Sequence, residues 1–286
     1  MTEKLDIGIL SWNAPAALKK AITAIEKNTV SDYRLFVIDN NSTDPEVKKV
    51  ILAKAEANSR IEPVLLQFNR KYSGGVNWLL ENAETQRVAY VDNDAYIQTE
   101  AWDAQMLNVL DRHHEVCMMF PGGGHYPLKR QHYTEILWGG GHCWMLARAR
   151  YEEIGGFDEE IGHQNEVDFQ TRLRLAGWKI ACVPHVRVIH EQHQTRDPAR
   201  KQIVNDGIIE WVNKWAAYFG GKHINYHSPN VIRFDDWNVI ALYLEEYYQQ
   251  HLPGLNSNPE TVVIEGKEYD LIKVPRFKNL YRNRII

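Results

Sequence analysis

The sequence predicts an α/β fold in which helices cover both faces of a mainly parallel β-sheet. Short apolar runs of strand length alternate with longer amphipathic stretches through the first half of the chain. This alternation is typical of βαβ units, whose right-handed crossovers produce a parallel sheet. The 286 residues, 44% of them hydrophobic, suffice for one large domain, or for one domain with an appendage.

Four runs have the length and composition of buried strands. They are Leu5–Ser11, Tyr33–Asp39, residues 61–68 and Arg87–Asp92. Helices are predicted between the first three runs. The first helix, residues 15–28, begins with Pro15, which the first turn of a helix accepts, and repeats its apolar residues on one face. The second, residues 42–58, opens with a cap residue and Pro45.

Polar side chains follow three of these strands at the point where each strand ends. They are Ser11, Asn13, Asp39, Asn40, Asn41, Asp92 and Asp94. Ligands of open parallel sheets bind beyond the carboxyl ends of the strands, so these side chains are expected to share one edge. For any one of them taken alone, a role in forming the turn is the simpler interpretation.

Asp92 and Asp94 are one residue apart and lie on the same side if the strand continues. Two carboxylates so close repel each other unless a cation or hydrogen-bond donors compensate their charge. A divalent ion bound to a diphosphate supplies that charge, and oxygen ligands favour Mg²⁺ or Mn²⁺ over zinc. The pair therefore predicts a Mn²⁺ or Mg²⁺ site.

Composition restricts the partners and the compartment. A net charge of −4 gives no general attraction to nucleic acid or to an anionic membrane. Cys117, Cys143 and Cys182 are far apart in apolar contexts, which is typical of reduced buried thiols and predicts a cytoplasmic protein. No stretch approaches the roughly 20 apolar residues that span a bilayer, so any membrane contact is expected to be peripheral, at the inner face of the membrane.

Six stretches cover about residues 5–195 in order: "ILSWNAPAALKKAI", "FVIDNNSTDPE", "NRKYSGGVNWLL", "VAYVDNDAYI", "GGGHCWMLARARYEEIGGFDEEI" and "NEVDFQTRLRLAGWKIACVPHVRVIH". Together they resemble the family 2 glycosyltransferases of the GT-A fold, in particular the rhamnosyltransferase-like branch. The resemblance implies a nucleotide-sugar-binding catalytic domain over residues 1–195, with a Rossmann-like mixed sheet. It also implies transfer of a sugar from a nucleotide diphosphate to an acceptor hydroxyl.

The resemblance assigns roles at the predicted sheet edge. Asp39 would contact the nucleotide base, Asp92 the ribose or the metal, and Asp94 would be the firmer metal ligand. His190, at the end of the apparent strand "VRVIH", matches a further metal ligand of the family, and imidazole suits Mn²⁺. A core or surface position is the alternative for His190.

The segment "NRKYSGGVNWLL" looks like the glycine-rich segment that precedes a helix in the family. Gly75 would allow the backbone to approach the donor, Asn77 would hydrogen-bond the nucleotide, and Arg70 would lie near the phosphates. The predicted donor-binding residues are Ser11, Asn13, Asp39, Asn41, Arg70, Gly75, Asn77 and Asp92.

The stretch "NEVDFQTRL" resembles the family motif that opens a helix and contains the general base, normally an aspartate. Glu166 falls at that position and is the first candidate for the general base, and Asp168 is the second. An inverting transfer needs a carboxylate that takes the proton of the attacking hydroxyl. Because the two acids are two residues apart on a helix, they point to different sides, and only one is expected to face the donor. Both acids could instead serve only to favour the helix dipole.

The acceptor side is predicted from two regions. "GGGHCWML" resembles a family strand along the acceptor cleft, where Trp138 and His142 would line the acceptor site. Residues 196–286 are expected to form a mainly helical extension that packs on the catalytic domain and shapes that site. Helices are predicted at residues 197–221 and 235–252, and two short strands around residues 265–267. Its last residues, 273–286, carry cations interleaved with aromatic side chains, which keeps a modified base in DNA as an alternative acceptor.

The sequence therefore predicts an inverting, metal-dependent glycosyltransferase whose donor is a UDP- or dTDP-linked sugar. The expected acceptor is a surface polysaccharide or its lipid-linked precursor. A sugar nucleotidyltransferase would need a glycine-rich loop with an arginine for the triphosphate, which "ILSWNAPAALKK" lacks. A non-catalytic nucleotide-sugar or glycan-binding module would have no need of the carboxylates at Asp92, Asp94, Glu166 and Asp168.

Overall fold

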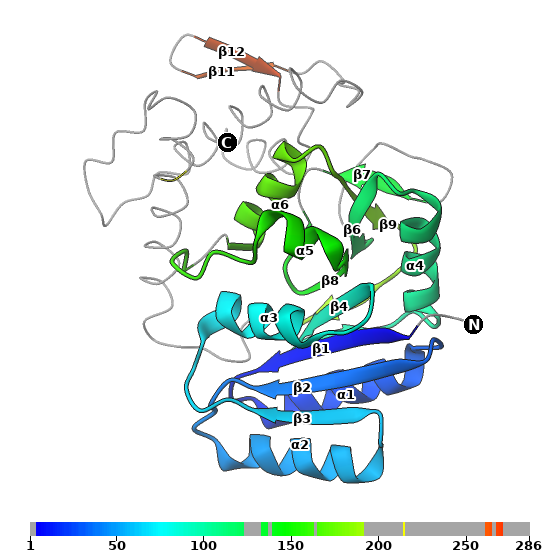
Figure 1. Cartoon of the computed structure of the whole chain (residues 1–286), viewed down its shortest axis with the longest axis vertical. Coiled ribbons are helices and arrows are strands. Elements are labelled where there is room, and N and C mark those ends of the chain that lie inside the picture. The colour runs from blue at the N-terminus through cyan, green and yellow to red at the C-terminus, as the bar shows by residue number, and fades with distance from the viewer. Residues whose placement is uncertain are drawn as a thin grey trace, which may run out of the picture.

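A computed structural model of the protein describes residues 4–122, 133–136, 139–162, 165–191, 214, 261–264 and 267–270. Its main strands are β1 (Leu5–Ser11), β2 (Tyr33–Asp39), β3 (Ile61–Leu65), β4 (Arg87–Asp92), β6 (Val116–Pro121), β7 (Thr134–Ile136), β8 (Cys143–Ala147) and β9 (Lys179–Val183). They form one eight-stranded sheet in the order β3-β2-β1-β4-β8-β6-β9-β7 (Figure 1). The first four strands pair in parallel, β8 is antiparallel to both of its neighbours, β9 is parallel to β6, and β7 is antiparallel to β9. The sheet is mixed and mainly parallel, as predicted.

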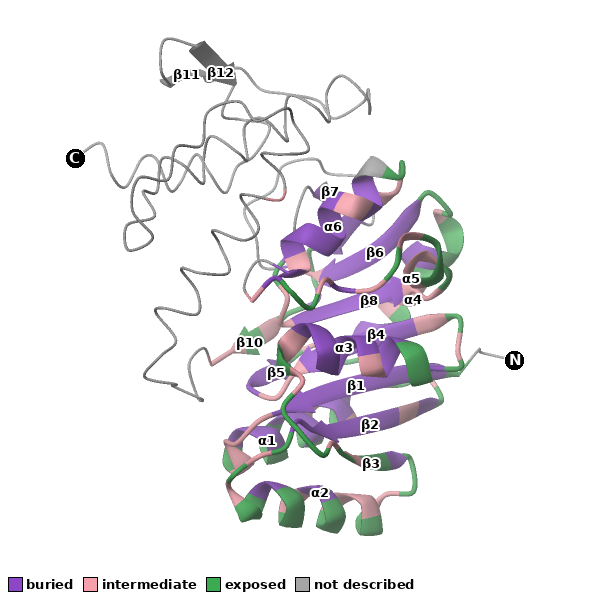
Figure 2. Ribbon diagram, turned by 60° about the vertical axis from the view of Figure 1, so that its left-hand side comes forward, coloured by how far each residue is buried: buried purple, intermediate pink, exposed green. Residues whose placement is uncertain are grey.

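Helices cover both faces of this sheet. They are α1 (Pro15–Asn28), α2 (Pro45–Ala57), α3 (Lys71–Asn82), α4 (Trp102–Arg112), α5 (Ala149–Ile154) and α6 (Asn165–Leu175). One hydrophobic cluster packs α1, α2 and α4 against one face, and a second packs α3, α5 and α6 against the other. The central strands β1, β2, β4, β6 and β8 are almost entirely buried, whereas the edge strand β3 and the outer side of α2 are largely exposed (Figure 2).

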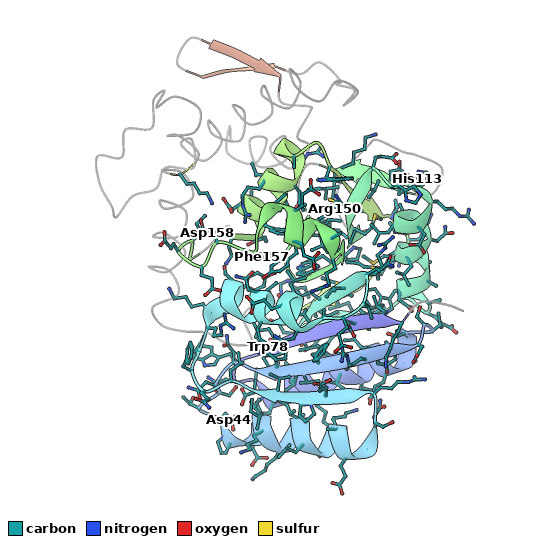
Figure 3. The ribbon with its side chains drawn as sticks, viewed as in Figure 1. Asp44, Trp78, His113, Arg150, Phe157 and Asp158 are labelled. Atoms are coloured by element: carbon teal, nitrogen blue, oxygen red, sulfur yellow. The ribbon has the colours of Figure 1, made fainter. Side chains whose placement is uncertain are left out.

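The elements predicted in the first half of the chain are confirmed, with one strand shorter than expected. β1, β2, β4 and α1 have the predicted bounds. α2 begins at Pro45, where the Asp44 side chain accepts a hydrogen bond of 2.9 Å from the Glu46 amide (Figure 3). β3 ends at Leu65 rather than at residue 68, because it is an edge strand whose only partner in the sheet, β2, ends opposite it at Asp39.

A small second sheet was not predicted, although the strand that ends at His190 was. β5 (Ala95–Ile97) pairs antiparallel with β10 (Val188–His190), at the carboxyl end of β4. Further on, two short strands were predicted and are present: β11 (Thr261–Ile264) pairs antiparallel with β12 (Lys267–Asp270).

Other predictions for the C-terminal extension fall on residues outside the described part of the chain. The helices expected at residues 197–221 and 235–252, apart from Lys214, and the basic tail at residues 273–286 belong to this group. The boundary between the catalytic domain and the C-terminal extension at residue 195 also stays a prediction. Among the described residues, no helix has both the length and the apolar character needed to cross a membrane.

Candidate functional site

The carboxyl ends of three neighbouring parallel strands meet at one edge of the sheet. Ser11, the last residue of β1, lies opposite Asp39, the last residue of β2. On the other side of β1, Leu10 lies opposite Asp92 at the end of β4. The expectation that these polar strand ends share one edge is confirmed.

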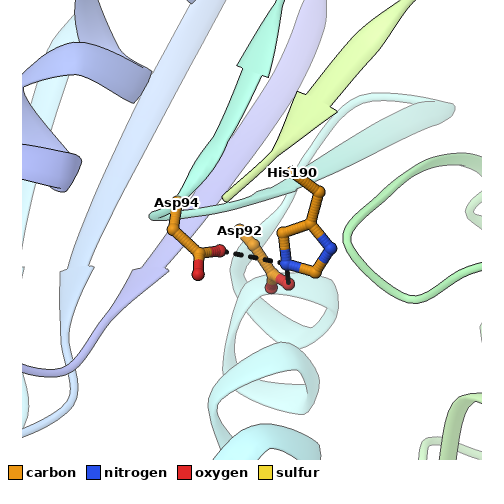
Figure 4. A group of neighbouring side chains, drawn as sticks. All are labelled: Asp92, Asp94 and His190. Carbon is orange, nitrogen blue, oxygen red and sulfur yellow. Dashed lines mark ion pairs between the residues drawn. The ribbon is translucent and has the colours of Figure 1, made fainter. Parts of the chain in front are cut away.

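The small sheet brings His190 to the paired aspartates. His190 lies opposite Ala95 in the β5–β10 pairing, directly after Asp94. Its Nε2 atom lies 3.1 Å from Asp94 Oδ1 and 3.6 Å from Asp92 Oδ2 (Figure 4). One ligand atom of each of the three residues lies within 4.8 Å of the other two. Residues about 100 positions apart in the chain therefore converge on a space suited to a single cation.

Contacts on both sides of β10 fix the position of His190. The Glu191 amide donates to the Asp94 carbonyl at 3.0 Å. The Glu191 carboxylate pairs with Lys20 of α1 and accepts a hydrogen bond of 3.1 Å from the Tyr96 hydroxyl. A strand of only three residues is thus attached to α1 and to β5. No local sequence pattern identifies this attachment.

The electrostatics of the cluster favour a bound cation. Burial raises the pKa of the Asp92 carboxyl to about 6, although the hydrogen bond from Tyr90 acts in the opposite direction and lowers this pKa. The His142 ring stacks on that of His190 with centroids 4.6 Å apart. Burial, together with the neighbouring His190, lowers the pKa of His142 to about 4, so this ring is neutral near pH 7. Two carboxylates and one imidazole form a donor set that suits Mn²⁺ or Mg²⁺, and the site fits such an ion.

Glu166, at the start of α6, lies beside the loop that carries His142. A Cβ atom on Gly141 would lie 3.2 Å from Glu166 Cγ and 3.3 Å from the Tyr72 hydroxyl oxygen, so a larger residue would crowd both. The Tyr72 hydroxyl donates to the Gly141 carbonyl at 3.1 Å. Burial, followed by the charges of Asp92 and Glu166, raises the pKa of Tyr72 well above its usual value. Glu166 therefore lies next to Gly141, the neighbour of His142, and its charge acts on the Asp92 carboxyl.

Asp168 has different surroundings from Glu166. Its carboxylate is fully buried, 2.9 Å from Arg172 Nε and 2.8 Å from Lys214 Nζ. The Arg172 guanidinium also donates to the carbonyls of Ile154 and Gly156, at 3.0 and 2.6 Å. Asp168 thus connects α6 to the end of α5 and to Lys214. That Asp168 is the alternative general base stays a prediction.

Two predicted donor-binding residues of α3 have packing or hydrogen-bonding roles in the fold. A Cβ atom on Gly75 would lie 2.4 Å from Leu10 Cδ1, so the glycine lets α3 pack closely against β1. The Asn77 amide exchanges two hydrogen bonds with the backbone of Phe157, at 2.8 and 2.9 Å. Arg70, just before α3, lies 3.5 Å from Glu159. A donor contact from any of the three stays a prediction.

The loops after β1 and β2 are held by their own polar side chains. Asn13 Oδ1 accepts hydrogen bonds from the Thr43 and Asp44 amides, at 3.0 and 3.1 Å. Asp39 accepts from the Ser42 amide at 2.9 Å, and Asn41 is exposed with a φ of 59°. These residues shape the edge on which a nucleotide would lie, and their donor contacts stay predictions.

Asn40, predicted to lie at this edge but not among the predicted donor-binding residues, also organises it. It is buried, accepts from the Arg70 amide at 2.8 Å and donates to the Lys71 carbonyl at 3.0 Å. It therefore fixes the start of α3 next to the end of β2. Ser11 is likewise buried at the end of β1, and Trp138, predicted for the acceptor site, lies outside the described residues.

Solved structures share this fold. The mannosyltransferase PcManGT from Pyrobaculum calidifontis, in complex with GDP-Man and Mn²⁺, superposes with a TM-score of 0.66 at 16% identity, covering 88% of this chain and 73% of that one. TarS residues 1–349 from S. aureus, in complex with UDP, superposes with a TM-score of 0.56 at 14% identity, covering 93% and 95%. At such low identity these likenesses show the fold alone, and it is the GT-A fold.

Sequence relatives give a consistent assignment. The chain is 22% identical over 269 residues to the O-antigen biosynthesis protein RfbC of Myxococcus xanthus, covering 80% of this chain and 20% of that protein. It is 40% identical over 67 residues to an N-acetylglucosaminyl-diphospho-decaprenol L-rhamnosyltransferase of Mycobacterium tuberculosis, covering 22% of each. The chain thus spans about a fifth of the length of these curated relatives. Residues 6–182, more than half of the chain, match the profile of Glycosyl transferase family 2. The protein belongs to glycosyl transferase family 2.

Proposed function

We propose that the protein is an inverting glycosyltransferase that uses a divalent metal ion and a nucleotide diphosphate sugar. The observation that carries this proposal is the convergence of Asp92, Asp94 and His190 at the carboxyl ends of the parallel strands. Open α/β sheets bind ligands at this edge. The likeness to structures that hold GDP-Man with Mn²⁺ or UDP supports the same type of ligand here.

Asp94, His190 and Asp92 are the residues that would hold the metal. A bound ion would supply positive charge to compensate the negative charge of the diphosphate leaving group. Asp39, at the end of β2, is the candidate for contacting the nucleotide base, and a UDP- or dTDP-linked donor is favoured. Mn²⁺ suits the imidazole ligand better than Mg²⁺.

Glu166 is proposed as the general base. The acceptor oxygen forms a bond to the anomeric carbon while the bond from that carbon to the diphosphate oxygen breaks and its electron pair leaves with the diphosphate. The hydroxyl proton passes to the Glu166 carboxylate. Two observations favour Glu166 over Asp168: it lies beside the His142 loop, whereas Asp168 is buried in ion pairs with Arg172 and Lys214.

The proposed acceptor is a hydroxyl group of a surface polysaccharide or of its lipid-linked precursor. The names of the two curated relatives, one in O-antigen biosynthesis and one acting on a diphospho-decaprenol, support this class. The alternative of a modified base in DNA was based on residues 273–286, which lie outside the described part of the chain. A cytoplasmic protein, in peripheral contact with the inner membrane face, would reach such a precursor.

The test is donor turnover followed by the stereochemistry of the product. Purified protein is incubated with UDP- and dTDP-sugars and candidate acceptors, with Mn²⁺ or with EDTA. Release of the nucleotide diphosphate is expected with Mn²⁺ and not with EDTA, and proton coupling constants should show an inverted anomeric configuration. Donor binding without turnover would instead indicate a binding module. Retained configuration would contradict the single-base mechanism.

A further inference from the structure

Tyr90 makes a short hydrogen bond to Asp92 from within the core. It lies two residues before Asp92 on β4, so both side chains are on the same face of the sheet. Its side chain is 1% exposed, and its hydroxyl donates to Asp92 Oδ1 at 2.6 Å. Hydrogen bonds of this length to a carboxylate belong to the strong, charge-assisted class.

Aromatic side chains fix the orientation of the Tyr90 ring. Trp144 stacks on it at a centroid distance of 5.3 Å and an interplanar angle of 22°, and Tyr72 meets it edge-on at 5.5 Å. Phe157 continues the stack beyond Trp144, with ring centroids 5.9 Å apart. The hydroxyl therefore has little freedom to follow Asp92 if the carboxylate turns.

The two oxygens of Asp92 consequently differ. Oδ1 accepts the Tyr90 hydrogen bond, whereas Oδ2 is the oxygen near His190 Nε2, at 3.6 Å. The Asp92 backbone is fixed separately, because its amide donates to the His142 carbonyl at 2.8 Å. Because the backbone is fixed, Oδ2 can change direction only if the Asp92 side chain rotates. The hydrogen bond from the Tyr90 hydroxyl restrains this rotation.

We propose that Tyr90 is a positioning residue for the metal site: it holds Asp92 Oδ1 so that Oδ2 faces the space between Asp94 and His190. This inference rests on the proposed metal site and adds to it the residue that orients one ligand. A hydrogen bond to a metal-bound carboxylate fixes its direction and strengthens metal binding. The alternative is that Asp92 only satisfies a buried hydroxyl, since a buried donor without a partner is costly.

The test compares Tyr90→Phe with Tyr72→Phe. Both variants keep the aromatic ring, which is buried at Tyr90 and partly buried at Tyr72, and lose one hydroxyl. Tyr72, however, donates to the Gly141 carbonyl and not to Asp92. Titration with Mn²⁺ alone, followed by electron paramagnetic resonance, measures free Mn²⁺ and the symmetry of the bound ion. We expect Tyr90→Phe to bind Mn²⁺ about 10 to 100-fold more weakly and with an altered spectrum, while Tyr72→Phe keeps the parent affinity.

Three outcomes would overturn the inference in distinguishable ways. If Tyr90→Phe binds Mn²⁺ like the parent and differs only in its unfolding temperature, the hydroxyl serves folding and the metal site stands. If both variants weaken binding equally, general loosening of the aromatic cluster accounts for the effect. If the parent itself binds no Mn²⁺, alone or with UDP, the metal site of the proposed function fails together with the role of Tyr90.

Discussion

Replacing Asp92 with Asn should stabilise the metal-free protein and abolish the stabilisation that a metal gives. The substitution removes one negative charge and keeps an oxygen that can accept the Tyr90 hydrogen bond. In the metal-free protein, burial raises the pKa of Asp92 from 3.8 to about 6. Above pH 6 the fold therefore contains an ionised carboxylate in surroundings that disfavour its charge.

The magnitude and its pH dependence follow from this shift. A difference of about two pKa units corresponds to about 3 kcal/mol, at 1.36 kcal/mol per unit. Because the Asp92 side chain is 25% exposed, solvent reduces the effect, and we expect about 1 to 2 kcal/mol. The folded state binds more protons than the unfolded state between about pH 4 and pH 6, so the free energy of unfolding falls as pH rises through that window.

The assay is urea unfolding of the parent and Asp92→Asn in EDTA, at about pH 7.5 and near pH 4. The variant should be the more stable at the higher pH by about 1 to 2 kcal/mol, and the difference should close near pH 4. With Mn²⁺ at about 100 times its dissociation constant, the parent should gain about 2.7 kcal/mol and the variant much less. Asp111→Asn controls for loss of one charge, since Asp111 is 58% exposed. A metal-free variant no more stable than the parent at the higher pH would refute the reasoning.

Two further predictions concern the base and the fold beneath it. Glu166→Gln should keep donor binding and lower transfer by about 10² to 10⁴, because proton transfer is lost, as measured by calorimetry and by product formation. Asp168→Asn is its matched control at the same helix start and should mainly lower the free energy of unfolding. If Asp168→Asn loses transfer activity while Glu166→Gln keeps nearly that of the parent, the two roles are reversed. Gly75→Ala should lower the free energy of unfolding by up to about 2 kcal/mol, because the new methyl would lie 2.4 Å from Leu10 Cδ1. Crowding of this kind costs about 1 to 3 kcal/mol, and the helix-propensity gain of about 1 kcal/mol offsets only part of it. Urea titration measures it, and an unchanged midpoint would show that Leu10 moves aside without cost.

The fold of the first half was predictable because its signals are local. β1, β2 and β4 are continuous apolar runs that become buried on both faces, and Pro15 and Pro45 mark the starts of α1 and α2. The end of β3 was not predictable from its own residues. The apolar run continues past Leu65, and the strand stops only because its partner does.

The candidate site was predictable where one strand carried the pattern. Asp92 and Asp94 could be paired by their spacing, whereas the approach of His190 depends on two strands of three residues, too short to show a period. The environment of Asp168 depends on Lys214, 46 residues further along the chain, which no local pattern indicates. Tyr90 had a usable signal: alternation places it on the same side of β4 as Asp92.

The most direct test of the metal-dependent donor site is isothermal titration of UDP and dTDP into the parent, Asp94→Asn and His190→Ala, with and without Mn²⁺. Because the two residues lie 3.1 Å apart and share one candidate cation, each variant should bind the nucleotide weakly whether or not Mn²⁺ is present, with Asp94→Asn the more affected. The parent should bind at least one of the nucleotides, and Mn²⁺ should strengthen that binding. Equal Mn²⁺-dependent binding by all three proteins would contradict the assignment of the metal to Asp92, Asp94 and His190.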